Sequence, residues 1–271
     1  MLSFNEKDIL RDKQKIEDKI IEYVPLIEKE YGLYIRGMTR NYLENNKNQL
    51  VELNKENAIS FIVSRGKLFL PTYAYKIFPI LMEQSNYNSN PDNRVEEKDY
   101  LNTNTTYTDY IHHVIEAGLT PYDYFEESLL HEVMHLCGSG GGTPLEEGIN
   151  ELKTRELAQK HHIKIAAMGY SKEVEIAKEL ESIIGKDTMS EVSFLDSRMA
   201  LDLIKRTNKD EVASLYENVR NTMIEQSNNY NSKMIKVSNP IEKAKLYSEI
   251  DYSKAHSLIN KYKLEKNNTK K

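Results

Sequence analysis

The sequence predicts an α+β fold that is mostly α-helical. Apolar side chains recur every three or four residues through much of the chain, which is the spacing of helices that bury one face. Two Thr-Pro pairs have the residue order that is typical of a helix start. Two short apolar runs flank Arg65-Gly66, and this arrangement favours a small β-hairpin or sheet.

The N-terminal part of the chain is expected to begin with a helix over residues 6–31. A second helix is expected before Glu56. The hairpin strands are predicted over residues 59–64 and 67–70, and residues 84–108, which are rich in Asn, Ser, Asp and Thr, indicate a long loop. Apolar residues of the first helix lie at intervals that place them on one face: Ile9, Ile16, Ile20, Val24 and Ile27.

A third predicted helix carries the most informative motif of the chain. Thr120 is expected to cap it, and it runs to about Cys137. Residues 131–135 read H-E-x-x-H, which places His131 and His135 one turn apart on the same face. Both imidazoles can then bind one Zn²⁺ at roughly 2.0–2.1 Å, with Glu132 beside the metal as a base.

The next helix offers a further ligand. Glycines from Gly138 to Gly142 end the motif helix, and Thr143-Pro144-Leu145-Glu146 has the pattern of a capping box, so a helix is expected from Pro144 to about Lys160. Glu147 and Glu151 are four residues apart and share a face. A short glycine connection allows that face to meet the two histidines, which supplies a third ligand.

These two helices resemble those of the gluzincin zinc metallopeptidases, in which the H-E-x-x-H histidines and a glutamate on a following helix hold zinc. The segment L-E-E-G-I-N-E, residues 145–151, looks like the E-G-x-x-E helix of many bacterial members. The resemblance implies a zincin-like core with His131, His135 and Glu147 as zinc ligands. It also implies that Glu151 hydrogen-bonds a ligand histidine and so fixes its orientation.

The resemblance is tightest over residues 125–155 and implies no subfamily, because the interval between His135 and Glu147 is shorter than in thermolysin or the zinc aminopeptidases. The ligand set indicates a zinc-dependent metallopeptidase. A zinc-bound water, whose pKa falls to about 7, would be activated by Glu132 and attack a peptide carbonyl. Glu132 would then pass the proton to the departing amine.

Such enzymes also carry a donor that stabilises the tetrahedral oxyanion. Tyr170 is our choice, because it follows Gly169 at the start of the next helix, and His161 and His162 are the alternatives.

Other readings of the motif remain. A metzincin would need a third histidine where this chain has Gly141, so that class is excluded. The glycine run does not match a phosphate-binding loop, because Thr143 occupies the position of its last glycine. An effector or toxin-like protease acting on one specific protein would use the same chemistry. A catalytically inactive, zinc-binding helical interaction protein and an ordinary amphipathic helix are the alternatives without catalysis.

The rest of the chain predicts a helical C-terminal lobe, and we expect three regions in all. These are an N-terminal helical segment (1–55), a zincin-like catalytic core with both motif helices (56–160) and the helical lobe (161–271). The helices of the lobe are expected near residues 172–184, 196–205, 210–226 and 240–261.

Composition restricts the partners and the compartment. The 271 residues carry a net charge of −5, which argues against nonspecific nucleic-acid binding and leaves a peptide or protein substrate as the expected partner. No apolar run reaches the roughly 18–20 residues of a membrane span, and the N-terminus lacks a signal core. A cytoplasmic protein is expected, with export by a route without a cleaved signal left open. The single cysteine, Cys137, cannot form an intramolecular disulfide.

Overall fold

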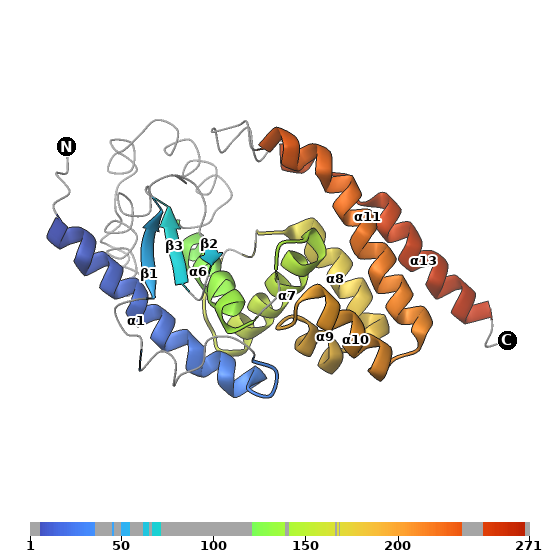
Figure 1. Cartoon of the computed structure of the whole chain (residues 1–271), viewed down its shortest axis with the longest axis horizontal. Coiled ribbons are helices and arrows are strands. Elements are labelled where there is room, and N and C mark those ends of the chain that lie inside the picture. The colour runs from blue at the N-terminus through green and yellow to red at the C-terminus, as the bar shows by residue number, and fades with distance from the viewer. Residues whose placement is uncertain are drawn as a thin grey trace.

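The computed structural model describes residues 6–35, 45, 50–54, 62–64, 67–71, 121–138, 141–165, 167, 169–234 and 246–268. Figure 1 shows α1 and the strands on one side, α6 and α7 in the middle, and the remaining helices on the other side. The elements are α1 (Glu6–Tyr31), β1 (Val51–Asn54), β2 (Ile62–Ser64), β3 (Lys67–Pro71), α6 (Pro121–Cys137), α7 (Pro144–Lys160), α8 (Ser171–Ile184), α9 (Lys186–Val192), α10 (Ser197–Thr207), α11 (Asp210–Met234) and α13 (Ser253–Asn268).

The expected fold class, an α+β fold built on a zincin-like core, is wrong for the described residues, which are predominantly helical. The strands have only four, three and five residues. They lie in the order β1-β3-β2, with β1 parallel and β2 antiparallel to β3. Val51 and Leu68, the two strand residues whose side chains the structure describes, are both fully buried in a hydrophobic core. The other members of that core come mostly from α1 and α6.

The helix expected before Glu56 falls mostly outside the described residues, although Asn45 is helical, and β1 follows at Val51–Asn54. A side chain from a distant part of the chain contacts the start of this strand. The buried carboxylate oxygen Oε1 of Glu17, on α1, accepts hydrogen bonds from the backbone N–H groups of Leu50 at 3.2 Å and Val51 at 3.3 Å. The loop expected over residues 84–108 lies outside the described residues.

The first hydrophobic cluster joins α1, the sheet and α6. The helix predicted over residues 6–31 is confirmed, and Ile20, Val24 and Ile27 on its apolar face are fully buried. They belong to one cluster with Leu129 and Val133 of α6. Complete burial of each such side chain is worth about 1.5–3 kcal/mol, so α1 forms a stable base for the motif helix.

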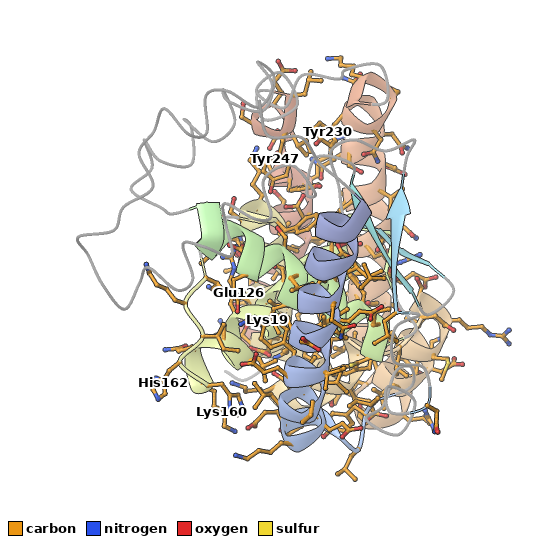
Figure 2. All side chains as sticks on the ribbon, turned by 90° about the vertical axis from the view of Figure 1, so that its left-hand side faces the viewer. Lys19, Glu126, Lys160, His162, Tyr230 and Tyr247 are labelled. Atoms are coloured by element: carbon orange, nitrogen blue, oxygen red, sulfur yellow. The ribbon has the colours of Figure 1, made fainter. Side chains whose placement is uncertain are left out.

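Polar contacts also fix α1 against α6. Nζ of Lys19, at 3.1 Å, and the hydroxyl of Tyr23 both donate hydrogen bonds to Oε1 of Glu126. Figure 2 labels Lys19 and Glu126 in the part of the molecule where α1 passes α6. Burial raises the pKa of the Glu126 carboxyl group above its ordinary value, although the neighbouring Lys19 ammonium acts in the opposite direction.

The second hydrophobic cluster joins α7 to the helices that follow it. The predicted helices over residues 172–184 and 196–205 are confirmed within one or two residues. The α8 residue Lys172 donates to three backbone carbonyls, those of Tyr247 at 3.3 Å, Ser248 at 2.9 Å and Ile250 at 2.6 Å. This ammonium group therefore holds the segment before α13 against α8.

The last predicted helix, over residues 240–261, is interrupted, because residues 246–248 are helical and residues 249–252 are not. Helix α13 then begins at Ser253, where Oδ1 of Asp251 accepts a hydrogen bond from the Ser253 N–H at 2.8 Å. Helix α11 begins at the expected residue but continues to Met234, and the short helix α9 was not predicted. None of the described helices has the length and apolar character needed to cross a membrane.

Candidate metal centre

Helix α6 presents the motif histidines to α7. The apolar residues of this helix are packed in the core, and four of them are fully buried: Leu129, Leu130, Val133 and Met134. The helix face that carries the two histidines contacts α7. The side-chain N–H of Asn150 donates to the backbone carbonyl of His131 over 3.0 Å. This bond fixes the position of α7 relative to the motif helix.

Helix α7 begins as the sequence predicts, with Thr143 as its N-cap. The Thr143 hydroxyl accepts from the Glu146 N–H, and the Glu146 carboxylate accepts from the Thr143 N–H at 3.2 Å, which completes the capping box. The helix then runs from Pro144 to Lys160, so the carboxylate of Glu147 lies in its first turn.

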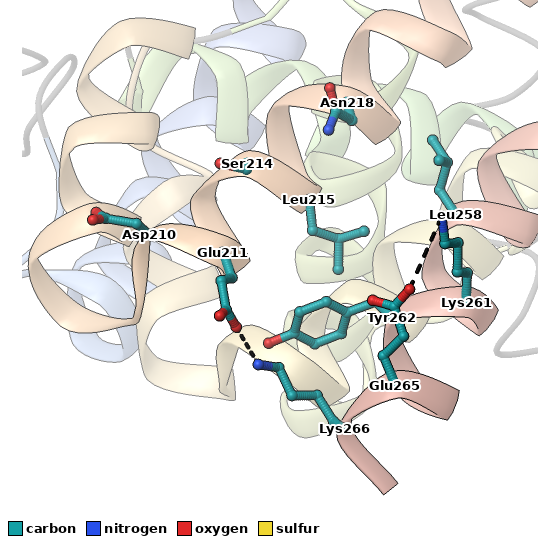
Figure 3. Close-up of a pocket in the computed structure, with 10 residues that line it drawn as sticks. All are labelled: Asp210, Glu211, Ser214, Leu215, Asn218, Leu258, Lys261, Tyr262, Glu265 and Lys266. Carbon is teal, nitrogen blue, oxygen red and sulfur yellow. Dashed lines mark hydrogen bonds and ion pairs between the residues drawn. The ribbon is translucent and has the colours of Figure 1, made fainter. Parts of the chain in front are cut away.

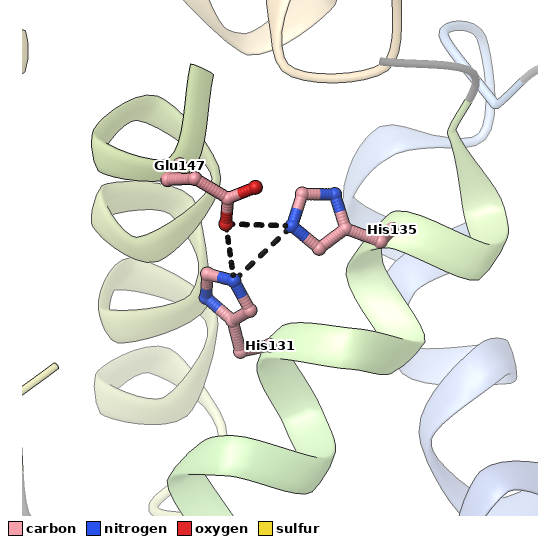
Figure 4. Close-up of side chains that lie close together, drawn as sticks. All are labelled: His131, His135 and Glu147. Carbon is pink, nitrogen blue, oxygen red and sulfur yellow. Dashed lines mark hydrogen bonds and ion pairs between the residues drawn. The ribbon is translucent and has the colours of Figure 1, made fainter. Parts of the chain in front are cut away.

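Three side-chain atoms converge between these helices. Nε2 of His131 lies 3.1 Å from Nε2 of His135, and Oε2 of Glu147 lies 3.1 Å and 3.2 Å from these two nitrogens (Figure 4). Within the described residues, this is the one group of three or more His, Cys, Asp or Glu side chains with the geometry to hold a metal ion.

The spacing of these atoms fits a tetrahedral zinc site. Two ligands that lie 2.0–2.1 Å from Zn²⁺ at tetrahedral angles are about 3.3 Å from each other. The observed separations of 3.1–3.2 Å are close to this value. Two imidazole nitrogens and one carboxylate oxygen are also a donor set that zinc accepts. The residues present therefore fit the metal that the motif implies.

The glycine loop shapes this site from the side of His135. Gly141 and Gly142 have φ angles of +134° and +106°, which favour glycine. The Gly142 N–H donates to Oε1 of Glu147 over 3.1 Å, so the other carboxylate oxygen is turned toward the histidines. A Cβ atom at Gly141 would lie 3.1 Å from the His135 ring. The loop is thus fitted closely to two of the candidate ligands.

A second carboxylate orients His131. Nδ1 of His131 lies 2.9 Å from Oε2 of Glu151, which is one turn beyond Glu147 on α7 and is 1% exposed. In the neutral form that binds a metal, the imidazole would donate its Nδ1–H to this carboxylate, which directs the lone pair of Nε2 at the convergence point. This contact has the geometry that the resemblance implies for Glu151.

The acidic surroundings change the protonation of the group. Burial alone would lower the pKa of His131, but hydrogen bonds with Glu147 and Glu151 raise it to about 10. Burial would raise the pKa of Glu147, and the bonds with both histidines outweigh it and hold that pKa below its usual range. Carboxylates that stabilise an imidazolium in this way also stabilise a bound divalent cation.

The motif glutamate lies in the same electrostatic environment. Burial raises the pKa of Glu132, while the neighbouring His131 and His135 lower it in part. The charges of the two candidate ligands therefore favour the ionised form of Glu132, against the effect of burial.

Tyr170 reaches the site from the N-terminus of α8. Its ring stacks on the ring of His131, with centroids 5.2 Å apart and an interplanar angle of 17°. Its φ of +50° is unusual for a residue of this size, and the residue is 39% exposed. Outliers of this kind persist where the surrounding structure enforces them, and they concentrate at functional sites.

The two alternatives to Tyr170 lie elsewhere. His161 follows Glu147 by fourteen residues, which places it about 21 Å along the axis of α7 at the helical rise per residue. Nε2 of His161 instead pairs with Glu30 of α1 at 3.0 Å. His162 is exposed in the turn that ends α7 (Figure 2). Neither histidine is near the convergence point.

The groove between α11 and α13 is separate from this site (Figure 3). It contains none of the motif residues and is lined by charged and polar side chains together with Leu215, Leu258 and Tyr262. An ion pair between Glu211 and Lys266 joins the two helices across it. The groove therefore adds nothing to the candidate metal centre.

Sequence reasoning did not identify several residues that support the site: Asn150, Arg155, Gly142 and Glu127. The spacing of four residues between Glu151 and Arg155 on one helix was a visible signal of an ion pair. The contacts of Asn150 and Glu127 depend on how the helices and the following loop pack together, so no local sequence pattern predicts them.

No family model, curated protein or solved structure that we compared with the chain matches it. A functional interpretation therefore depends on the chemistry of the site itself.

Proposed function

We propose that this protein is a gluzincin-like, zinc-dependent metallopeptidase that hydrolyses peptide bonds. The observation that carries the proposal is the convergence of His131, His135 and Glu147, with Glu132 next to His131 in the motif helix. Two histidines and a carboxylate are a ligand set of catalytic zinc sites, and a carboxylate in the motif can serve as the base.

The three converging side chains would hold the ion. Glu151 keeps the Nε2 lone pair of His131 directed inward, and the Gly142 N–H keeps Glu147 turned toward the histidines. A bound Zn²⁺ supplies a water that ionises near neutral pH and a Lewis acid that polarises a carbonyl group.

Glu132 carries out the proton transfers. Its carboxylate accepts a proton from the water as the water oxygen bonds to the peptide carbonyl carbon. It then donates this proton to the amide nitrogen as the carbon–nitrogen bond breaks, so one residue serves both steps. The oxyanion that forms between these steps needs a hydrogen-bond donor. Tyr170 is our candidate, because its ring lies against His131.

The size of the donor group favours catalysis over a structural metal. A closed structural zinc site takes four protein ligands, whereas a catalytic site keeps one position for water. Among the described residues, the candidate group consists of three. A hydrolytic zinc site is therefore better supported than a structural zinc site in a helical interaction protein.

Metal content tests the proposal first. Wild type and the His135→Ala and Glu132→Gln variants are purified without chelator or added metal and measured by plasma mass spectrometry. We expect about one zinc per chain in wild type and in Glu132→Gln, and loss of zinc in His135→Ala. Circular dichroism of each variant checks that it is folded.

A peptide library, read by mass spectrometry, then tests the reaction. Cleavage by wild type that disappears in Glu132→Gln supports the peptidase. Wild type that carries no zinc overturns the proposal. Bound zinc without cleavage of the library or of whole proteins favours the interaction protein, and cleavage of one protein alone favours an effector-type protease.

A further inference from the structure

Arg155 lies one turn beyond Glu151 on α7 and is the outer member of a chain of contacts that ends at the metal centre. Nε of Arg155 donates to Oε1 of Glu151 at 2.7 Å. The other oxygen of this carboxylate accepts from Nδ1 of His131 at 2.9 Å. One carboxylate thus joins the guanidinium group to the imidazole of a candidate ligand.

A second set of contacts runs from the same guanidinium group to the loop before α8. Nη2 of Arg155 donates to the backbone carbonyl of Gly169. The Gly169 N–H donates to Oε1 of Glu127 at 2.8 Å, and this carboxylate oxygen lies 3.9 Å from Nη2. Gly169 directly precedes Tyr170, whose ring covers His131. Arg155 therefore contacts both supports of the same imidazole.

Burial makes these contacts necessary. Glu151 is 1% exposed and Glu127 is 2% exposed, and a buried carboxylate is costly unless a positive charge and hydrogen bonds satisfy it. The planar fork of arginine can direct separate N–H groups at a carboxylate and at a carbonyl. A lysine ammonium at this position would keep the charge but lack the fork.

We propose that Arg155 is a positioning residue of the metal centre, which aims Glu151 at His131 and fixes the loop that places Tyr170 against the same ring. This inference rests on the proposed function, since it presupposes that His131 binds metal. Arg155 contacts no substrate or ion in this role and acts only through Glu151 and Gly169.

The affinity for Zn²⁺ alone tests this, measured by competition with a chromophoric chelator. Removal of a group that orients a metal ligand typically weakens metal binding about 10–100-fold, and we expect roughly tenfold for Arg155→Met. Arg155→Lys should recover part of this loss, because it restores the charge. It also keeps the inference testable if Arg155→Met does not fold.

Lys153→Met provides the matched control. Lys153 is a fully buried cation on the same helix, but it pairs with Glu156 and Glu181 and has no contact with this network. Its loss should lower stability and leave the zinc affinity of the folded protein within about twofold of wild type. A general loss of stability would therefore not reproduce the expected pattern.

A double-variant cycle tests the route of the effect. If Arg155 acts mainly through Glu151, Arg155→Met combined with Glu151→Gln should bind zinc about as weakly as Glu151→Gln alone. Fully additive losses would overturn the part of the inference that runs through Glu151. A zinc affinity of Arg155→Met equal to that of wild type would overturn the whole inference while the proposed function stands. Wild type that binds no zinc would overturn both.

Discussion

Gly148, the residue directly after Glu147, packs against the backbone of α8, and its replacement by alanine should destabilise the protein. A Cβ atom at this position would lie 2.5 Å from the backbone carbon and oxygen of Glu173 and 2.6 Å from its Cβ. A Cβ atom does not approach non-bonded atoms this closely in folded proteins. Rotation of a side chain cannot relieve the contact, because it involves the backbone of Glu173. The two helices would have to move apart.

The magnitude follows from two opposing effects. Overpacking in a close-packed interior typically costs about 1–3 kcal/mol, and the backbone contact places this site in the upper part of that range. Alanine also gains about 1 kcal/mol over glycine in a helix interior. A net loss of about 1–2 kcal/mol in the free energy of unfolding remains. At roughly 2–4 °C per kcal/mol, this lowers the melting temperature by about 2–8 °C.

Chemical and thermal denaturation of the zinc-free protein measures this change. Asn228→Ala, at an exposed position of α11, is the control. It also gains helix propensity by a change to alanine, but its new side chain makes no close contact. If Gly148→Ala were as stable as wild type or more stable, the close approach of α7 and α8 would be refuted. The glycine of the E-G-x-x-E segment would then have no packing role.

Three further predictions concern other parts of the structure. Gly141→Ala should weaken zinc binding more than Gly142→Ala, because its Cβ presses on the His135 ring whereas the Cβ at Gly142 meets no atom within 4 Å, and chelator competition compares the two. Burial raises the pKa of Glu126 above 4.5, so the folded protein keeps the Glu126 carboxyl group protonated to higher pH than the unfolded protein does. The stability that this protonation contributes is lost as pH rises through the raised pKa. Denaturation of Glu126→Gln across pH should lack that loss, and an unchanged pH profile would contradict it. Burial also raises the pKa of the Cys137 thiol, so a thiol reagent should label it only after unfolding, and rapid labelling of the native protein would be inconsistent with its position.

Much of the candidate site could be predicted because its signals are local. The capping box at Thr143 fixes where α7 begins, and the interval of four residues in H-E-x-x-H fixes which side chains share a face. The roles of Glu147, Glu151 and Tyr170 stay predictions until metal binding and hydrolysis are measured.

The rest depends on contacts between distant segments. Strand β1 forms where the carboxylate of Glu17 satisfies two backbone N–H groups, and its own four residues do not reveal this partner. Helix α7 appears polar in sequence, yet Asn150, Lys153 and Thr154 are buried in it. Each has a hydrogen-bond partner within its own helix or on a neighbouring one, so position in the fold decides their burial.

Helix α7 contributes to both hydrophobic clusters: Leu157 and Ala158 belong to the first, and Leu145, Ile149 and Leu152 belong to the second. The candidate ligand Glu147 is therefore carried by the element that the two clusters share. Unfolding of either cluster removes packing contacts from α7, so a substitution that destabilises one cluster should also destabilise the other. A fragment cut within or before this helix would lack part of both cores, and the protein should behave as one cooperative unit under mechanical or proteolytic stress.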